Sequence, residues 1–446
     1  MVRSILGALL ALVISALPLA GQVGSPAGPV PVEFLAARRA ALLDRIDDGI
    51  ALVRSADPRE QQGDYPQDGE YREDNDFFYL TGLEAPGGWL LLSGTDELVR
   101  LYLPARDPEM ERWTGPTLGP GPEAAELTGI SEVRPLSDLA GDLAELRRGS
   151  AEAVPVYIKP GRSQVCERLA EVTEQSCTEL LGVSETDTRD LRPHLAALRL
   201  IKDEDELRRL RRAIEITTDA QRAAMRSVRP GLWEYEIEAL IEYTFRKSGA
   251  ERVGFPSIIG SGPNSTILHY DKSRREMEYG DLVVMDIGAE YGYYTADVTR
   301  TIPVSGKFTP RQREIYDLVL GAQEAAFAAT KPGVTVGQLN QIARNYIRDN
   351  SGDLCGQVTC DRYFVHGLSH WLGLDVHDVG DYSTPLAPGM VLTIEPGIYL
   401  PEEGFGVRIE DDFLVTEDGA ELLSAGAPRQ ADEIEKLMAE GPVPLP

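Results

Sequence analysis

The chain has 446 residues, of which 42% are apolar and 26% are charged, as in ordinary globular proteins. Lys and Arg total 44 against 72 Asp and Glu, which gives a formal net charge of −28. This composition excludes a chain that is disordered, collagen-like or coiled-coil throughout, and the acidic surplus argues against nucleic acid or an anionic membrane as a partner. The question that remains is whether some of these carboxylates carry out chemistry.

The first segment has the pattern of an export signal. Arg3 precedes an apolar run from Ile5 to Ala20, which is short for a membrane-spanning helix. We therefore predict a signal peptide over residues 1–20, a periplasmic or secreted protein, and no membrane span in the mature chain. An uncleaved N-terminal anchor is the alternative. Residues 21–31 are rich in Gly and Pro, which is typical of a linker.

The next segment alternates between strand and helix patterns. Apolar runs at residues 88–92 and 98–104 are expected to be strands, and residues 137–148 are expected to be a helix. This alternation predicts an α/β N-terminal domain over residues 32–195.

The chain changes character near Arg192-Pro193. Apolar residues at three- and four-residue spacing predict a long amphipathic helix over Lys202–Arg226. Further helices are expected at 234–247, 310–329 and 336–350, with strands between and after them. This pattern predicts an α+β second domain over residues 196–438 and a short tail over residues 439–446.

The four cysteines form two local pairs, Cys166/Cys177 and Cys355/Cys360. Neither pair has the C-x-x-C spacing of a zinc site, which argues against a thiolate metal centre. In an exported chain such pairs can form disulfides, and free thiols are the alternative. Both possibilities stay open for both pairs.

Two stretches of the second half, residues 280–286 and 389–395, repeat one pattern of a glycine, an apolar strand and a carboxylate. The carboxylates are Asp286 and Glu395, and each is followed by a second acid, Asp297 or Glu410. Two-stranded ribbons would bring each pair together, and two ribbons facing each other would place four carboxylates in one cavity. Burying unpaired carboxylates is costly, so these acids indicate bound metal ions or a network of Arg and Lys.

Basic residues near these acids refine the prediction. Arg408 is a candidate ion-pair partner for Glu410. Four of the five histidines lie in the same half as the acids, while His194 precedes it and is expected at the surface. One imidazole among several carboxylates suits divalent ions such as Mn²⁺, Zn²⁺ or Co²⁺, and other histidines could hydrogen-bond a developing oxyanion.

Four segments of this half resemble the creatinase/methionine aminopeptidase (M24, pita-bread) metallopeptidases, and among them most closely aminopeptidase P. They are MDIGAEYGYYTADVTRT, HGLSHWLGLDVHDVG, LTIEPGIY and VRIEDD. The first half resembles the same family in YREDNDFFYLTGLEAPGGWLLL and LPARDPEMERWTG. The resemblance covers about residues 32–438 and implies a pita-bread fold for the second domain. The cysteine-bearing stretch before His366 and the short connections between the later motifs depart from the family pattern without removing a ligand.

The resemblance also implies a role for each matching residue. Two divalent metal ions, most simply Mn²⁺ with Zn²⁺ or Co²⁺ as alternatives, would be held by Asp286, Asp297, His370, Glu395 and Glu410. Glu395 would also accept the proton of the attacking water. Substrate and reaction intermediate would be contacted by His269, His366 and His377. Arg408 would orient a ligating carboxylate, and Trp113 would reach the pocket of a neighbouring subunit in a homodimer or homotetramer.

The implied activity is that of an Xaa-Pro aminopeptidase, which releases the first residue of a peptide whose second residue is proline, through a metal-bridging hydroxide. A bond to proline lacks an N–H, so a peptidase that relies on metal ions suits it better than one that binds an extended backbone. The alternatives are a prolidase, which cleaves only Xaa-Pro dipeptides, and a non-catalytic binding protein of the same fold. The complete set of five ligands argues against the binding protein.

Overall fold

The computed structural model describes residues 25–46, 48–56, 71–148, 154–159 and 187–442. The expected signal peptide and the pair Cys166/Cys177 lie outside these residues. Among the described residues, no helix has both the length and the apolar character that crossing a membrane requires.

The N-terminal domain is built around a six-stranded sheet in the order β4-β3-β2-β1-β5-β6. Its strands are β1 (Ile50–Arg54), β2 (Trp89–Ser93), β3 (Leu98–Leu103), β4 (Glu132–Pro135), β5 (Val156–Ile158) and β6 (Thr188–Asp190). Side chains alternate between the two faces of a strand, so Ile50 and Leu52 pack toward α5 (Leu139–Arg148) while Ala51 and Val53 join the opposite core. The predicted strands and helix of this α/β domain are confirmed.

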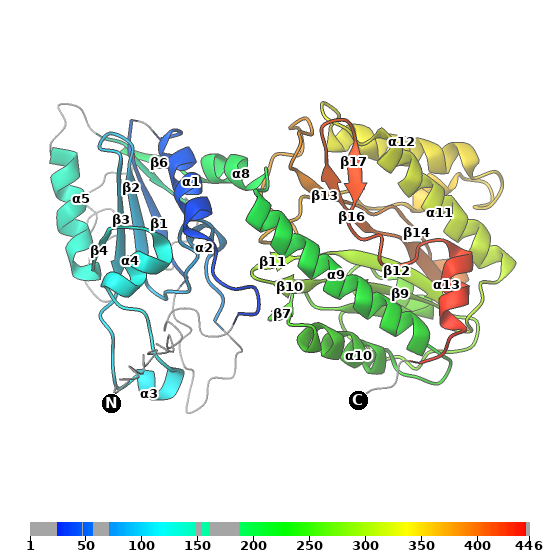
Figure 1. Ribbon diagram of the computed structural model, residues 1–446. Coiled ribbons are helices and arrows are strands. Elements are labelled where there is room, and N and C mark those ends of the chain that lie inside the picture. Colours follow the sequence, from blue (N-terminus) through cyan, green and yellow to red (C-terminus); the bar gives the residue numbers. More distant parts are fainter. Residues whose placement is uncertain (1–24, 47, 57–70, 149–153, 160–186, 443–446) are drawn as a thin grey trace, which may run out of the picture.

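Helices α1 (Val32–Leu43), α2 (Asn75–Thr81) and α4 (Pro122–Thr128) supply the core opposite α5 (Figure 1). The short helix α3 (Glu111–Thr114) projects from the lower end of this domain in the same view. His194 is half-buried rather than fully exposed, because its ring packs edge-on against Tyr157.

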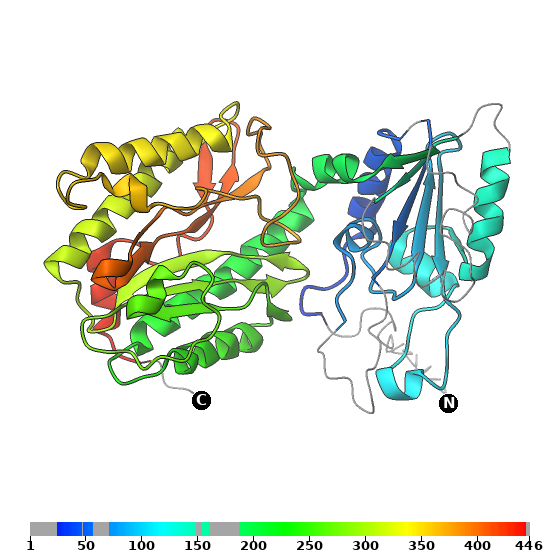
Figure 2. The same cartoon turned by 180° about the vertical axis from the view of Figure 1, so that it is seen from behind.

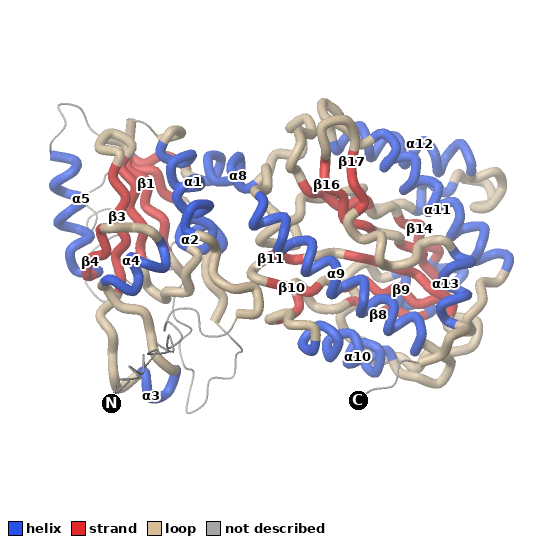
Figure 3. Tube along the Cα trace, viewed as in Figure 1, coloured by secondary structure: helices blue, strands red, loops and turns tan. Residues whose placement is uncertain are grey.

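Helix α8 (Arg192–Arg199) leads into the second domain, whose strands lie inside a shell of helices (Figures 2 and 3). The helices are α9 (Glu204–Ser227), α10 (Glu234–Lys247), α11 (Pro310–Ala329), α12 (Val336–Asn350) and α13 (Ala431–Met438). The first of these begins two residues later than predicted because Asp203 is its N-cap: the Asp203 side chain accepts the N–H of Glu206, and the Glu206 side chain accepts the N–H of Asp203.

The inner strands of the second domain form small antiparallel sheets, in the orders β12-β9-β8, β13-β16-β17, β14-β15 and β11-β10-β7. The strands that bear on the site are β9 (Leu282–Ile287), β12 (Val298–Pro303), β13 (Val391–Ile394), β14 (Gly397–Leu400), β15 (Phe405–Arg408) and β16 (Asp411–Val415). The others are β7 (Arg252–Val253), β8 (Ile258–Ser261), β10 (Ala289–Tyr291), β11 (Tyr294–Thr295) and β17 (Ala420–Leu422). The loop between α12 and His366 contains a disulfide between Cys355 and Cys360.

The two domains share one hydrophobic core cluster. Side chains of the N-terminal sheet and of α1 and α2 pack together with residues of the second domain. The contributing residues of the second domain are Leu210, Tyr293, Tyr294, Leu372, Leu374, Val391 and Leu414. The interface between the domains is therefore packed like a domain interior and does not depend on the connecting chain alone.

Candidate metal centre

The four acids of the repeated pattern stand at the ends of two antiparallel ribbons, as predicted. In the first ribbon Asp286 lies opposite Thr299, and Asp297 directly precedes β12. In the second, β13 pairs with β16 so that Ile394 faces Asp411; Glu395 follows one strand and Glu410 precedes the other. Asp286, Asp297 and Glu410 are between 2% and 7% exposed. The fold thus places these acids in the interior.

His370 brings the two ribbons to a common point. Its Nε2 lies 3.4 Å from an Asp297 oxygen, 3.7 Å from a Glu395 oxygen and 3.6 Å from a Glu410 oxygen. Its Nδ1 lies 3.1 Å from the carbonyl oxygen of Trp371. If Nδ1 donates its proton to that carbonyl, the lone pair of Nε2 faces the carboxylates, which is the tautomer that a metal ligand requires.

The electrostatics of the cluster call for added positive charge. Burial, together with the neighbouring Glu410 and Asp286, raises the pKa of Asp297 well above its ordinary value. Burial and Glu410 likewise raise the pKa of Glu395. Burial alone would lower the pKa of His370, but the nearby carboxylates raise it well above its ordinary value. Without bound cations, the cluster could reduce its negative charge only by taking up protons.

The donor set fits metal ions on independent geometric grounds. Donor atoms of Asp297, His370 and Glu410 lie within 4.8 Å of one another. Asp286 Oδ1, Asp297 Oδ1 and Glu410 Oε1 are buried and have no hydrogen-bond partner among the residues that the structure describes. Buried polar atoms are rarely left unpaired, and unpaired oxygens beside an imidazole are what hard or borderline divalent cations bind.

Arg408 holds Asp286 and not Glu410, so the ion pair expected with Glu410 is wrong. Its Nη2 lies 2.6 Å from Asp286 Oδ2, and its Nη1 donates to the hydroxyl of Tyr399 at 2.9 Å. Glu410 instead accepts a hydrogen bond of 2.7 Å from the Thr299 hydroxyl. The reason is the register of β14 and β15, in which Arg408 pairs with Gly397 and directs its side chain toward the first ribbon. Arg408 is expected to orient a candidate metal ligand, and the candidate ligand that it contacts is Asp286.

The three other histidines of this half lie at different depths around the cluster. His366 Nε2 is 2.8 Å from the Tyr399 hydroxyl, and its Nδ1 is 3.7 Å from a Glu395 oxygen. Burial lowers the pKa of His366 to about 4, which leaves its ring neutral at ordinary pH. His377 is exposed, and its ring centroid lies 4.1 Å from that of His370. Partial burial, His370 and the exposed His269 together lower the pKa of His377.

Trp113 does not reach this centre within one chain. It lies on α3 of the N-terminal domain, with its side chain 82% exposed. Figure 1 shows α3 at the lower end of the N-terminal domain, outside the second domain that contains the ribbons. The role expected for Trp113 depends on a second subunit and stays a prediction.

Two glutamines support the ribbons and were not predicted. Gln221 of α9 donates to the carbonyls of Met285 and Val298, which flank Asp286 and Asp297 in the chain. Gln323 of α11 donates in the same way to the carbonyls of Ile394 and Ile409, each of which directly precedes an acid of the second ribbon. Both glutamines are fully buried. The only available signal was a polar residue on the apolar face of each helix.

The five-residue cluster can be compared with known proteins. A model of metallopeptidase family M24 matches residues 208–417, and a model of the aminopeptidase P N-terminal domain matches residues 35–157. The Xaa-Pro aminopeptidase of Escherichia coli (strain K12) is 38% identical over 434 residues, which cover 90% of this chain and 96% of that protein. The chain belongs to metallopeptidase family M24. Membership implies that its site holds divalent metal ions.

Solved structures of this family confirm the predicted fold class. Zinc-substituted E. coli aminopeptidase P in complex with product is 35% identical and matches with a TM-score of 0.83, covering 93% of this chain and 99% of that one. The same E. coli enzyme with the inhibitor Pro-Leu matches with equal score, identity and coverage. The architecture is therefore an α/β aminopeptidase P domain followed by a pita-bread domain.

Proposed function

We propose that this M24 protein is an Xaa-Pro aminopeptidase, which releases the N-terminal residue of peptides with proline at the second position. The observation that carries this proposal is the convergence of three carboxylates on His370, with the carboxylate of Asp286 as a further neighbour of Asp297 and Glu395. This cluster lies in a chain that is similar to an Xaa-Pro aminopeptidase over nearly its whole length.

Two divalent metal ions, with Mn²⁺ as the native metal and Zn²⁺ or Co²⁺ as alternatives, are proposed for the cluster. The ligands would be Asp286, Asp297, His370, Glu395 and Glu410. Bound ions would polarise the scissile carbonyl and would lower the pKa of a metal-bound water molecule to near neutrality. The unpaired buried oxygens of three of these acids support the assignment.

The protein side chains divide the remaining work. Glu395, the most exposed of the four acids, is the proposed acceptor of the proton from the attacking water. His377 is proposed to donate a hydrogen bond to the substrate carbonyl oxygen as it gains negative charge, and His366 and His269 are proposed to contact the substrate. The acidic interior favours the cationic N-terminal amine of a peptide.

The surroundings of the enzyme are also proposals. The disulfide between Cys355 and Cys360 supports export to an oxidising compartment, as the N-terminal signal pattern predicts. The exposed Trp113 supports a homodimer or homotetramer in which this side chain approaches a neighbouring pocket.

Activity on peptides of different length tests the function. We expect the metal-loaded enzyme to cleave an Xaa-Pro-Xaa tripeptide, to leave the matching Xaa-Ala-Xaa tripeptide intact, and to lose activity when chelated. Adding back Mn²⁺, Zn²⁺ or Co²⁺ separately, with metal analysis of each sample, identifies the metal. Cleavage of the Xaa-Pro dipeptide alone would identify a prolidase instead, and absence of any metal-dependent cleavage would favour a binding protein.

A further inference from the structure

The loop from His370 to Asp378 connects a candidate metal ligand to a substrate-side histidine. At its start, the N–H of His370 donates to the Thr393 hydroxyl at 3.2 Å and its carbonyl accepts from the Thr393 N–H at 3.0 Å. These two hydrogen bonds attach His370 to β13 independently of the rest of the loop. His377 is exposed at the other end, so its position depends on what holds that end.

Asp378, the residue after His377, anchors the far end of the loop. Its side chain is 1% exposed, and both of its carboxylate oxygens are engaged. Arg199 donates to one oxygen, and Lys202 Nζ donates to the other at 3.2 Å. The carboxylate packs so close to the backbone of Gly373 that a Cβ added there would lie 2.1 Å from it. The loop thus closes on itself around this carboxylate.

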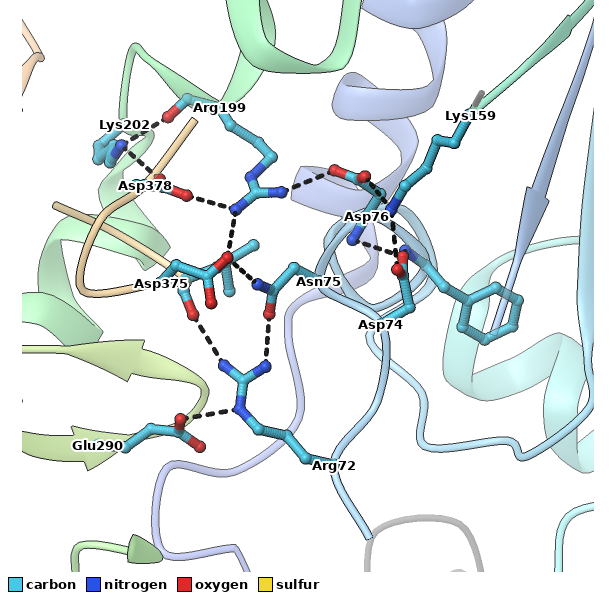
Figure 4. A network of polar contacts seen from close by, with 12 residues as sticks. Arg72, Asp74, Asn75, Asp76, Lys159, Arg199, Lys202, Glu290, Asp375 and Asp378 are labelled. Atoms are coloured by element: carbon cyan, nitrogen blue, oxygen red, sulfur yellow. Dashed lines mark hydrogen bonds and ion pairs between the residues drawn. The ribbon is translucent and has the colours of Figure 1, made fainter. Parts of the chain in front are cut away.

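Arg199 joins this anchor to the N-terminal domain (Figure 4). It is the last residue of α8, its side chain is 3% exposed, and its Nη1 donates to Asp76 Oδ1 at 2.8 Å. One guanidinium group therefore bridges a carboxylate of α2 and the carboxylate next to His377. The planar fork of arginine makes this bridge, whereas a single lysine ammonium cannot reach both carboxylates in the same way.

The middle of the loop is held by the same domain. Arg72 donates to the carbonyl of Leu374 at 2.7 Å, and Asn75 donates to Asp375 at 2.6 Å (Figure 4). The side chains of Leu372 and Leu374 belong to the core cluster that the two domains share. The N-terminal domain therefore contacts the backbone, the acidic side chains and the apolar side chains of the loop.

We propose that Arg199 is a positioning residue that fixes His377 over the metal centre by tying Asp378 to the N-terminal domain. This inference rests on the proposed function for the effect on rate, but not for the anchoring itself. It gives the N-terminal domain a part in the chemistry of the second domain within a single chain.

The first test is a double-mutant cycle with metal-loaded protein. Arg199→Lys should lower kcat on an Xaa-Pro-Xaa tripeptide by about tenfold or more, because a shift of about 1 Å in a reacting group has effects of this size or larger. KM and bound metal should stay close to wild-type values. In the His377→Ala background the same change should cost little further activity, because the histidine that it positions is already absent.

Arg209→Lys is the matched control. Arg209 is buried to a similar degree, pairs with Asp205 within α9 and donates to the Gly28 carbonyl at 3.1 Å. Its effect on activity should combine independently with that of His377→Ala. If the effects of Arg199→Lys and His377→Ala on activity also combined independently, the proposal would be overturned. That result would show that Arg199 acts only through stability.

The second test does not use activity. Arg199→Lys should speed hydrogen exchange of the backbone amides of residues 373–378, while exchange in β9 and β13 stays as in wild type. Unchanged exchange in the loop would overturn the anchor. Inactivity of the wild-type enzyme toward Xaa-Pro peptides would instead contradict the proposed function, and the exchange comparison would still decide on the anchor.

Discussion

At the scale of single residues, Asp286 and His377 separate metal binding from substrate contact. Asp286 is buried and its Oδ2 is held by Arg408, while its Oδ1 has no hydrogen-bond partner in the described part of the chain. Asp286→Ala should therefore abolish peptide cleavage and lower the metal content below that of wild type. Metal analysis beside the tripeptide assay checks this, and full activity of the variant would contradict the site assignment.

His377 is exposed, and its ring lies beside the ring of His370. His377→Ala should keep the wild-type metal content and lower kcat, by about 10²-fold if it acts on the transition state. Parallel metal analysis of the two variants is the measurement. Equal loss of metal in both would place His377 among the ligands instead.

Glu206 makes stability depend on pH at a site outside the metal centre. It is 1% exposed, accepts hydrogen bonds from the Asp203 N–H and the Tyr294 hydroxyl, and burial raises its pKa from 4.5 to about 7. Between these two values the folded chain binds a proton that the unfolded chain has lost. The free energy of unfolding should therefore fall by about 3 kcal/mol as pH rises through this window, and then level off.

Glu206→Gln removes this titration. In urea unfolding at several pH values, the variant should gain stability relative to wild type as pH rises from about 4.5 to about 7. A difference between the two proteins that does not change with pH would show that Glu206 titrates normally in the fold.

At the scale of elements, Gln221 and Gln323 show how the helices support the ribbons. Each donates to two backbone carbonyls next to the candidate ligands, and each is buried. Gln221→Leu removes one hydrogen-bond donor from each of two buried carbonyls, which should lower the free energy of unfolding by about 1–3 kcal/mol and weaken metal binding. Gln341→Leu is the control, because Gln341 is exposed and bonds only to Asn345 among the described residues. Urea unfolding and metal titration of both variants check the prediction, which similar losses in the two would contradict.

Elements with strong local patterns could be predicted from the sequence, and so could the pairing of the four acids. The repeated glycine–strand–carboxylate pattern carried enough local information to predict both ribbons. The partner of Arg408 could not be predicted, because it depends on the register of β14 with β15 and on which ribbon this strand pair faces. The roles of Gln221 and Arg199 could not be predicted either, since a buried polar side chain has no sequence signal until its distant partners are known.

At the scale of the whole molecule, the shared core should make the two domains unfold together. Tyr294, Leu372 and Leu374 of the second domain pack with the N-terminal domain, and Phe78 stacks on Tyr293 with ring centroids 3.8 Å apart. Separating the domains would expose these apolar side chains to water. Calorimetry of the metal-loaded protein should therefore show one main unfolding transition. Two well-separated transitions would mean that the interface contributes little.

The shared core also has a consequence for how the protein is made. Val30, near the start of the described chain, and Leu414, near its end, belong to the same cluster. During synthesis from the N-terminus, this cluster cannot close until the strand that carries Leu414 has left the ribosome. Contacts so distant in sequence also form slowly. The last strands to be synthesised thus complete the hydrophobic core of the first domain.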